Sequence, residues 1–271
     1  MLTTLLAVLV LLQPGNPAPA PGSDDPKFQI NYAAVPAPRK DQWWIDRNNS
    51  FNARAKQGAA KGDIDIIFVG DSITQGWEQA GKNVWNTFYG DRQAVDFGIG
   101  GDRTQQVLYR VSTGNLDGLD TPDSGNSPRL VVLMIGTNNT APDPTTGNPN
   151  TPAQINEGVR ACVNAIHDKL PGTHILVLGI FPRGEKPDDS NRKVVAATNE
   201  LLKNVGEGGA GEPAMANVHF LDISDRFIEK DGTISRAVMP DMLHLSEKGY
   251  TIWAEAIRSH VDKWAPKRAD Q

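Results

Sequence analysis

The sequence predicts an α/β fold in which helices cover both faces of a parallel sheet of about five strands. Short and nearly continuous apolar runs, rich in β-branched residues, recur along the chain, which is typical of strands buried on both faces. Segments with apolar residues three and four positions apart lie between and after these runs, which indicates helices packed by one face. Alternating strands and helices imply right-handed crossovers and a three-layer α/β/α sandwich.

Each expected element follows from its pattern. The strands are expected at Ile64–Val69, Ala94–Ile99, Leu130–Ile135, His174–Ile180 and Val218–Ile223. The clearest helical faces run through Ile155, Val159, Cys162, Val163, Ile166 and Leu170, then through Val194, Val195, Leu201, Leu202 and Val205, and last through Tyr250, Trp253, Ala254, Ile257, Val261 and Trp264. In such sheets ligands bind beyond the carboxyl ends of the strands, so functional residues are expected in the loops that follow them.

The length and charge of the chain limit its class. Its 271 residues suit one α/β domain, expected at residues 28–271. The formal net charge of -5 argues against a broad cationic surface, so nucleic acid is not an expected partner. The single Cys162 lies on an apolar helical face and is expected to pack in the core, and one cysteine cannot form an internal disulfide.

The N-terminal residues predict export. Leu2–Leu12 form a short apolar run, and Ala18–Ala20 resemble the small-residue pattern of a signal-peptidase site. Residues 1–20 are therefore expected to be a signal peptide and residues 21–27 a flexible linker, which predicts a secreted or periplasmic protein. The alternative is an unstructured tail, because no basic residue precedes the run. The run is shorter than the roughly 20 apolar residues of a membrane span, so no stable membrane insertion is expected.

Each of the first three strands ends in a polar turn that contains glycine: Gly70-Asp71-Ser72, Gly98–Asp102 and Gly136–Asn139. These turns are expected to meet at one edge of the sheet. A serine between a strand and a helix presents its hydroxyl outward, and its backbone N–H lies at the positive helix start. Ser72 is therefore a candidate nucleophile, although Gly-Asp-Ser taken alone also fits an ordinary turn or helix cap.

A serine nucleophile needs a base and a group that orients the base. Four of the five histidines are expected on helices or in and beside strands: His167, His174, His219 and His260. His244 instead lies in the loop before the last helix, and Asp241 is three residues earlier, near enough to bond its imidazole. An isolated Asp-x-x-His often has only a local role. The serine and glycines expected at the same edge favour His244 as the base and Asp241 as its orienting group.

Acyl transfer also needs donors for the negative charge that develops on the carbonyl oxygen. The backbone N–H groups of Ser72 and Gly101 and the side-chain amide of Asn138 are the candidates. Gly101 allows a close approach of the backbone to a substrate, but it also fits a tight turn. Asn138 could equally close an Asx-turn.

Together, Ser72, Gly101, Asn138, Asp241 and His244 resemble the four ordered blocks of the GDSL-type, or SGNH, hydrolases, whose fold is flavodoxin-like. The resemblance implies a serine carboxylester hydrolase without a cofactor or a metal. Ser72 would be the nucleophile, His244 the base and then the acid, and Asp241 its orienting group. The oxyanion hole would consist of Ser72, Gly101 and Asn138.

A closer resemblance, over roughly Ile64 to Trp264, is to the catalytic subunits of intracellular platelet-activating-factor acetylhydrolase. Asp96–Asp102, Gly136–Asn139 and Pro182–Pro187 carry it. In those relatives the residues after the nucleophile and before the histidine border a small acyl pocket. The corresponding residues here are Ile73 and Leu243, which implies an acetyl or another short acyl group.

Three departures from these relatives concern the substrate: a longer Gly114–Pro128 connection, an Ala141–Pro152 loop, and an N-terminal segment with Trp43 and Trp44. All are expected to border the cleft. Export would favour O-acetylated carbohydrate, with a phospholipid acetylhydrolase or lysophospholipase-type esterase as the alternative. The two tryptophans could stack on sugars, but packing is the commoner role of such a pair.

Other classes fit the sequence less well. No Gly-x-x-x-x-Gly-Lys-Ser/Thr motif occurs, and Gly98–Gly101 lacks the spacing of a dinucleotide-binding loop. A metal hydrolase could use Asp71, Asp241 and His244, but no ligand cluster with recognisable spacing is present. A non-catalytic carbohydrate-binding module on the same fold is the alternative that fold alone does not exclude.

Overall fold

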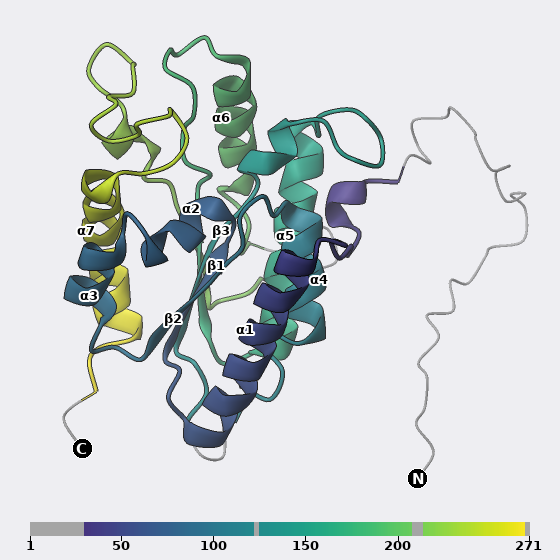
Figure 1. Ribbon diagram of the computed structural model, residues 1–271, viewed down its shortest axis with the longest axis vertical. Coiled ribbons are helices and arrows are strands. Elements are labelled where there is room, and N and C mark those ends of the chain that lie inside the picture. The colour runs from purple at the N-terminus through teal and green to yellow at the C-terminus, as the bar shows by residue number, and fades with distance from the viewer. Residues whose placement is uncertain (1–29, 122–124, 208–213, 269–271) are drawn as a thin grey trace, which may run out of the picture. The chain divides into compact units, whose positions relative to one another are not determined.

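Five parallel strands lie side by side in the described part of the computed structural model, in the order β2-β1-β3-β4-β5 (Figure 1). The structure describes residues 30–121, 125–207 and 214–268. The strands are β1 (Ile66–Gly70), β2 (Ala94–Gly98), β3 (Leu130–Met134), β4 (His174–Leu178) and β5 (Val218–Leu221). Every neighbouring pair is parallel, which confirms the predicted sheet.

Helices connect the strands in chain order. The α-helices are α1 (Gln42–Lys61), α2 (Ser72–Gln75), α3 (Lys82–Tyr89), α4 (Thr104–Thr113), α5 (Pro152–Lys169), α6 (Ser190–Leu202) and α7 (Glu247–Trp264). Short 3₁₀ helices are η2 (Tyr32–Ala34), η3 (Gly76–Glu78), η5 (Thr137–Thr140) and η6 (Ser224–Phe227). The starts of α5 and α7 are capped by local side chains, because Thr151 accepts from the N–H of Gln154 and Ser246 from that of Gly249.

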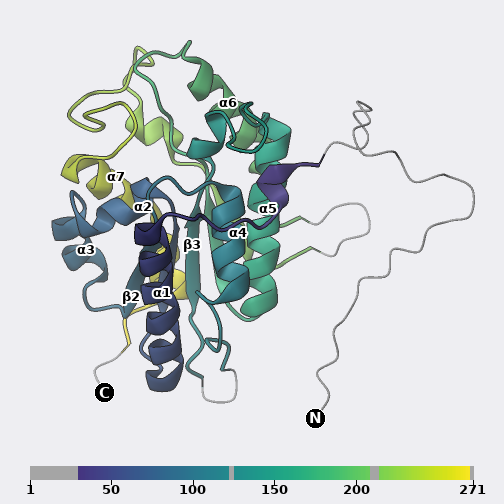
Figure 2. The same ribbon diagram turned by 45° about the vertical axis from the view of Figure 1, so that its right-hand side comes forward.

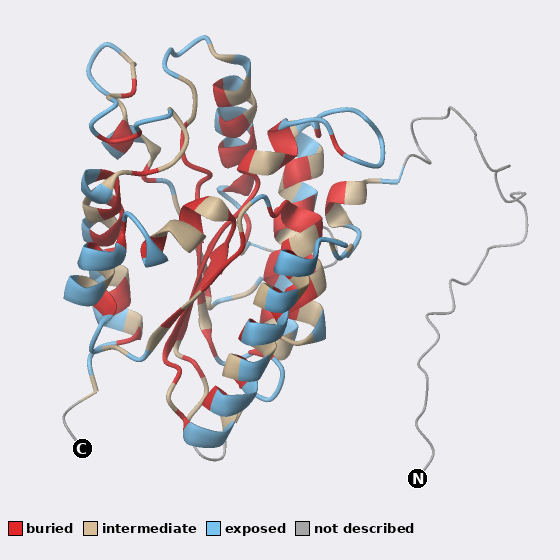
Figure 3. Cartoon of the chain, viewed as in Figure 1, coloured by how far each residue is buried: buried red, intermediate tan, exposed pale blue. Residues whose placement is uncertain are grey.

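Every residue of β1 and β3, in the middle of the sheet, is buried, as continuous apolar runs predict, whereas β2 and β5 at its edges are partly covered (Figure 3). In β1, Ile67 and Val69 join the core under α1, α4, α5 and α6, whereas Ile66 and Phe68 join the core under α3 and α7. Figure 2 shows α1, α4 and α5 along the same face. The molecule therefore has the three layers that the sequence predicts. Of the predicted helical positions, Leu201 is the exception, since it is 44% exposed.

An aromatic cluster fills the layer between the sheet and α7. Its rings belong to Phe68, Trp77, Tyr89, Tyr250 and Trp253. Within it, the Tyr250 hydroxyl donates a hydrogen bond of 2.7 Å to the backbone oxygen of Ile73. The packing of α7 thus fixes the short helix that begins at Ser72.

The described residues of the Gly114–Pro128 connection, 114–121 and 125–128, do not border the carboxyl edge of the sheet, contrary to the prediction. It joins the end of α4 to the start of β3, and its Asp117 pairs with Lys169 in the last turn of α5. Asn126 lies beside Gly62, which ends α1. Each crossover helix returns the chain to the edge where strands begin, so a loop that precedes a strand lies away from the other edge.

Two findings concern the ends of the chain and the membrane. The predicted signal peptide and linker, residues 1–27, lie outside the described residues. From Tyr32 onward the described residues belong to one compact unit. Within the described ranges, no helix has the length and the apolar character needed to cross a bilayer.

Candidate active site

Three predicted side chains form a continuous line of hydrogen bonds. Ser72 follows β1 and begins α2, whereas His244 and Asp241 lie in the loop before α7. Ser72 Oγ lies 2.9 Å from His244 Nε2, and His244 Nδ1 lies 2.7 Å from Asp241 Oδ2. The fold thus joins a serine and a histidine that are 172 positions apart. Such a chain can carry the serine proton to the imidazole while the carboxylate stabilises the resulting positive charge.

Asp241 also shapes the loop that holds His244. Its Oδ1 accepts hydrogen bonds from the backbone N–H groups of Leu243 and His244, at 3.1 and 2.7 Å. Burial raises the pKa of Asp241, but the hydrogen bonds from the ring and backbone of His244 outweigh it and lower that pKa below its usual value. The carboxylate stays charged and favours the tautomer with the proton on Nδ1, which leaves Nε2 free to accept.

The backbone between Asp241 and His244 makes a tight turn. Met242 has a φ of +63°, which is uncommon for a residue with a side chain. Its carbonyl accepts a hydrogen bond of 2.9 Å from the N–H of Gly184. The predicted Pro182–Pro187 motif therefore supports the histidine loop.

Asp71 fixes the turn before Ser72. Its Oδ1 accepts a hydrogen bond of 2.9 Å from the N–H of Ile73, as a helix cap does. The side chain is fully buried, and Oδ2 has no hydrogen-bond partner among the described residues. Burial, with a smaller contribution from Asp102, raises the pKa of Asp71 to about 7.

The three candidate oxyanion donors come from three strand-end loops. Gly101 is exposed and has a φ of +78°, a conformation that favours glycine. Asn138 donates one amide hydrogen to the backbone oxygen of Asp102 at 2.8 Å, which fixes the amide and leaves its second hydrogen available. The glycine loop passes close to the nucleophile, since a Cβ built on Gly100 would lie 3.7 Å from Ser72 Cβ.

A buried ion pair joins these loops behind the surface. Arg110 has no exposed side-chain area, and its Nε lies 2.8 Å from Asp102 Oδ2 while its Nη2 donates to the carbonyl of Gly70 at 2.8 Å. The second oxygen of Asp102 accepts a 2.7 Å hydrogen bond from Trp44 Nε1. One arginine thus ties the loop that contains Gly101 to the end of β1.

Sequence reasoning missed this pair, although Arg110 stands among apolar positions of its helix. A cation on an apolar face indicates a buried carboxylate partner. Trp44, 1% exposed, has the packing role that the sequence favours. Trp43 is 49% exposed and lies under the guanidinium of Arg39.

A groove of about 720 Å³ begins at the oxyanion loops. Its lining consists of Ala37, Pro38, Arg39, Lys40, Asp41, Gly101, Arg103, Gln105, Gln106, Asn138, Ala141, Pro142, Pro144 and Thr145. The Ala141–Pro152 loop therefore borders this cleft, as expected. Arg103 holds the loop in place, because its Nη1 donates to the carbonyls of Asn138, Ala141 and Pro142.

The two residues predicted for an acyl pocket differ in accessibility. Ile73 is fully buried and packs in the core under α3 and α7, so in this structure it offers no surface to a substrate. The sequence could not reveal this, because the direction of its side chain depends on how α2 packs against α7. Leu243 is partly exposed and directly precedes His244.

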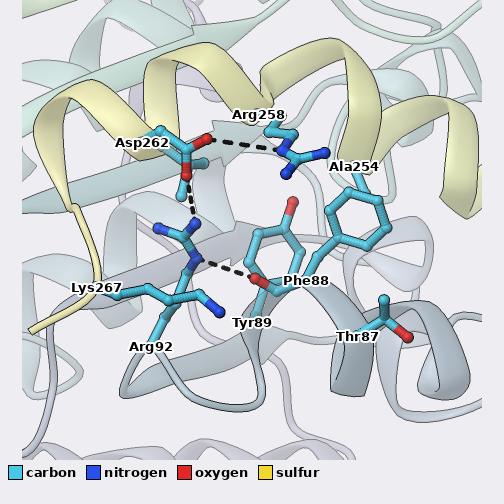
Figure 4. Close-up of a pocket in the computed structure, with 9 residues that line it drawn as sticks. Thr87, Phe88, Tyr89, Arg92, Ala254, Arg258, Asp262 and Lys267 are labelled. Carbon is cyan, nitrogen blue, oxygen red and sulfur yellow. Dashed lines mark hydrogen bonds and ion pairs between the residues drawn. The ribbon is translucent and has the colours of Figure 1, made fainter. Parts of the chain in front are cut away.

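A separate pocket of about 130 Å³ lies between α3 and α7 (Figure 4). Arg92 bonds the carboxylate of Asp262 and the carbonyl of Phe88 there, and Arg258 Nε lies 3.6 Å from Asp262. These contacts join the two helices. No predicted site residue lines this pocket.

Comparison with known proteins identifies the family of this chain. The GDSL-like lipase/acylhydrolase family model matches residues 68–252. The chain is 35% identical to platelet-activating factor acetylhydrolase IB subunit alpha2 of Rattus norvegicus over 81% of this chain and 86% of that protein. It is 34% identical to the alpha1 subunit of Homo sapiens over 84% of this chain and 89% of that protein.

Among solved structures, a catalytic mutant of an acetylxylan esterase from Geobacillus stearothermophilus has a similar fold. Its TM-score is 0.56 at 18% identity, over 76% of this chain and 97% of that one. The likeness supports the three-layer fold, and the family match covers the loops that contain Ser72, Gly101, Asn138, Asp241 and His244. The chain is therefore a carboxylester hydrolase that belongs to the GDSL-like lipase/acylhydrolase family.

Proposed function

We propose that this chain removes acetyl or other short acyl groups from esters through an acyl-enzyme formed on Ser72. The observation that carries the proposal is the line of hydrogen bonds from Ser72 through His244 to Asp241, at 2.9 and 2.7 Å. The loop that contains Gly101 and the loop that contains Asn138 supply hydrogen-bond donors for an oxyanion. No metal or organic cofactor is needed for this chemistry.

In the first step Ser72 Oγ attacks the ester carbonyl carbon while its proton passes to His244 Nε2. The negative charge on the carbonyl oxygen is bound by the N–H groups of Ser72 and Gly101 and by the Asn138 amide. The intermediate collapses, and His244 returns the proton to the departing alkoxide. A water molecule then attacks the acyl carbon while its proton passes to His244. This second intermediate collapses as His244 returns the proton to Ser72 Oγ, which releases the carboxylic acid and restores the serine hydroxyl.

The test is covalent labelling combined with turnover. An organophosphate is expected to add to Ser72 in the wild-type chain, and Ser72→Ala is expected to lower kcat on an aryl acetate by at least about 10³-fold. The matched control is Ser259→Ala, which removes an exposed hydroxyl on α7. Full activity in Ser72→Ala, or labelling at another residue only, would rule the mechanism out.

For the natural substrate we propose O-acetylated carbohydrate. The groove beside Gly101 supports it, because its lining includes a guanidinium, a carboxylate, amides and a hydroxyl that can bond sugar hydroxyls, next to the flat apolar surfaces of prolines. The acetylxylan esterase with the same fold is consistent with it. A phospholipid acetylhydrolase is the second candidate, on the strength of the two mammalian subunits.

A direct competition separates these candidates. Acetate release is measured from an acetylated xylooligosaccharide and from a 2-acetyl phospholipid, with an aryl ester series from acetate to octanoate for acyl length. A higher kcat/KM on the oligosaccharide and a fall beyond short acyl groups are expected. A preference for the phospholipid would select the second candidate. Sugar affinity without any turnover would leave only a carbohydrate-binding module.

We also propose that the protein is exported and that residues 28–271 act as one hydrolase domain. The apolar run Leu2–Leu12 and the small residues before Pro21 support the first part. Expression of the full chain with a C-terminal tag, followed by N-terminal sequencing of the medium or periplasmic fraction, tests it. An intracellular protein that still contains Leu2 would contradict export.

A further inference from the structure

The peptide unit between Gly100 and Gly101 is bonded on its carbonyl side by a cation. The C=O of Gly100 and the N–H of Gly101 belong to the same peptide group. Arg39 Nη1 donates a hydrogen bond of 2.9 Å to that carbonyl oxygen. The N–H of Gly100 donates in turn to Gln75 Oε1 at 2.7 Å. The loop is therefore held from both sides.

Arg39 is itself fixed in place. Its Nε donates to Asp41 Oδ2 at 2.9 Å, and its guanidinium carbon lies 4.9 Å from the centre of the Trp43 ring. The side chain is 25% exposed. A Cβ built on Gly101 would lie 2.9 Å from Arg39 Nη1, so a side chain there would displace the guanidinium from this position.

A hydrogen bond to a carbonyl polarises its peptide and makes the N–H of that peptide a stronger donor. The effect is larger when the donor is charged. We infer that Arg39 is a positioning residue that orients and polarises the Gly100–Gly101 peptide, so that the Gly101 N–H binds the oxyanion more tightly than a neutral contact would allow. This inference rests on the proposed function, because it needs an oxyanion at Gly101.

A purely structural role would be to attach residues 37–41 to the body of the protein. Arg47 provides a matched comparison, because it makes the same three kinds of contact. Its Nε donates to the carbonyl of Gly98 at 2.8 Å, it pairs with Glu78, and it lies 4.9 Å from the Phe51 ring centre. The carbonyl of Gly98 belongs to the peptide with Ile99, which has no oxyanion role. Only Arg39 should affect the chemical step.

The experiment compares Arg39→Ala with Arg47→Ala on an aryl acetate whose leaving group does not need the groove. Arg39→Ala is expected to lower kcat about tenfold, less than the 10²–10³ of a deleted oxyanion donor, because the N–H itself remains. KM is expected to change by less than about twofold, since the contact strengthens mainly in the transition state. Arg47→Ala is expected to leave kcat near that of the wild type.

Two further measurements separate charge from folding. Methylboronic acid forms a tetrahedral anion on a serine, so its inhibition constant should rise in Arg39→Ala by about the same factor as kcat falls. Arg39→Lys keeps the charge and Arg39→Gln does not, so the lysine variant should retain more activity. Thermal unfolding of all four variants shows whether each of them is folded. If Arg39→Ala does not fold, the comparison of Arg39→Lys with Arg39→Gln tests the inference instead.

Different outcomes would overturn the role of Arg39 and the proposed function of the protein. Equal kcat in the Arg39→Ala and Arg47→Ala variants, an unchanged boronate affinity, or a glutamine variant as active as the lysine variant would overturn the role of Arg39. A wild-type chain that neither hydrolyses the aryl acetate nor is labelled at Ser72 would instead overturn the proposed function.

Discussion

At the scale of single residues, the site combines a serine with carboxyl groups in contrasting environments. Asp241 is hydrogen-bonded by the His244 ring and by two backbone N–H groups, and its pKa is lowered. Asp71 is fully buried, one of its oxygens has no partner within the described part of the chain, and its pKa is raised to about 7. Asp241 is thus suited to hold a cationic imidazole, whereas Asp71 is suited to hold the turn.

Asn138 gives the first prediction at this scale. Asn138→Ala removes the amide hydrogen that is free to bind an oxyanion, so kcat on an aryl acetate is expected to fall about 10²–10³-fold. Asn148→Ala, in the exposed loop beyond, is the control and should keep wild-type activity. Steady-state kinetics of both variants test this prediction. If kcat of Asn138→Ala falls by less than about twofold, Asn138 is not part of the oxyanion hole.

The raised pKa of Asp71 gives a second prediction, on stability. Its protonated form is favoured in the folded state, so its contribution to stability is full below the unfolded pKa near 3.8, declines as the pH rises, and is lost above about 7. Asp71→Asn keeps an acceptor for Ile73 without the charge. The change in the free energy of unfolding that Asp71→Asn causes should be more favourable at pH 8 than at pH 4 by several kcal/mol. Each pKa unit of difference between the folded and unfolded protein corresponds to about 1.4 kcal/mol.

Urea unfolding of both proteins between pH 4 and 8 measures this difference. A variant whose stability falls between pH 4 and 7 as steeply as that of the wild type would show that Asp71 does not titrate there.

His244 determines the third prediction, on the pH dependence of activity. Only the neutral imidazole can accept the Ser72 proton, so kcat/KM is expected to fall tenfold per pH unit on the acid side once His244 is protonated. A pH series of kcat/KM on an aryl acetate, corrected for unfolding, tests it. A rate that stays constant through the acid range would exclude His244 as the base.

At the scale of elements, buried contacts hold the strand ends in register with the helices. Arg110 on α4 reaches both Asp102 in the glycine loop and Gly70 at the end of β1. Tyr250 on α7 reaches Ile73 in α2. The helices on both faces of the sheet therefore position the loops at its carboxyl edge.

Arg110→Met should destabilise the protein by about 3–5 kcal/mol, because it leaves the Asp102 carboxylate buried without its cation. The control is Lys203→Met, which breaks an exposed pair with Glu200 and should cost at most about 1 kcal/mol. Chemical unfolding at pH 7 compares the two. A similar small loss in both variants would mean that Asp102 is not charged in the folded protein.

At the scale of the whole molecule, the two edges of the sheet have separate roles. The loops that follow strands contain Ser72, Gly101 and Asn138, and the groove opens beside them. The Gly114–Pro128 connection lies at the other edge and contacts the last turn of α5. Substitutions at that edge should change stability but not specificity.

A bulky side chain in each place tests this separation. Thr145→Trp would fill part of the groove and is expected to raise KM for an acetylated xylooligosaccharide by about tenfold, while kcat/KM for an aryl acetate stays near the wild type. Asp117→Trp, at the opposite edge, should change neither constant. An unchanged KM in Thr145→Trp would show that the alcohol part of the substrate does not occupy this groove.

The sequence by itself determined the parallel sheet and the residues that meet at its carboxyl edge. Apolar runs of strand length are local signals, and the geometry of parallel sheets then brings the turns that follow them together. This is why the sequence alone predicts that Ser72 and His244 meet, and their side chains lie 2.9 Å apart in the structure. The bounds of the five strands differ by at most two residues from those expected.

Only the tertiary structure decided what supports and surrounds that edge. The contacts of Arg39 with Gly100 and of Tyr250 with Ile73 join residues 61 and 177 positions apart. The burial of Ile73 likewise depends on how α2 packs against α7. Such contacts depend on side-chain directions across separate elements, and no local spacing or composition encodes them.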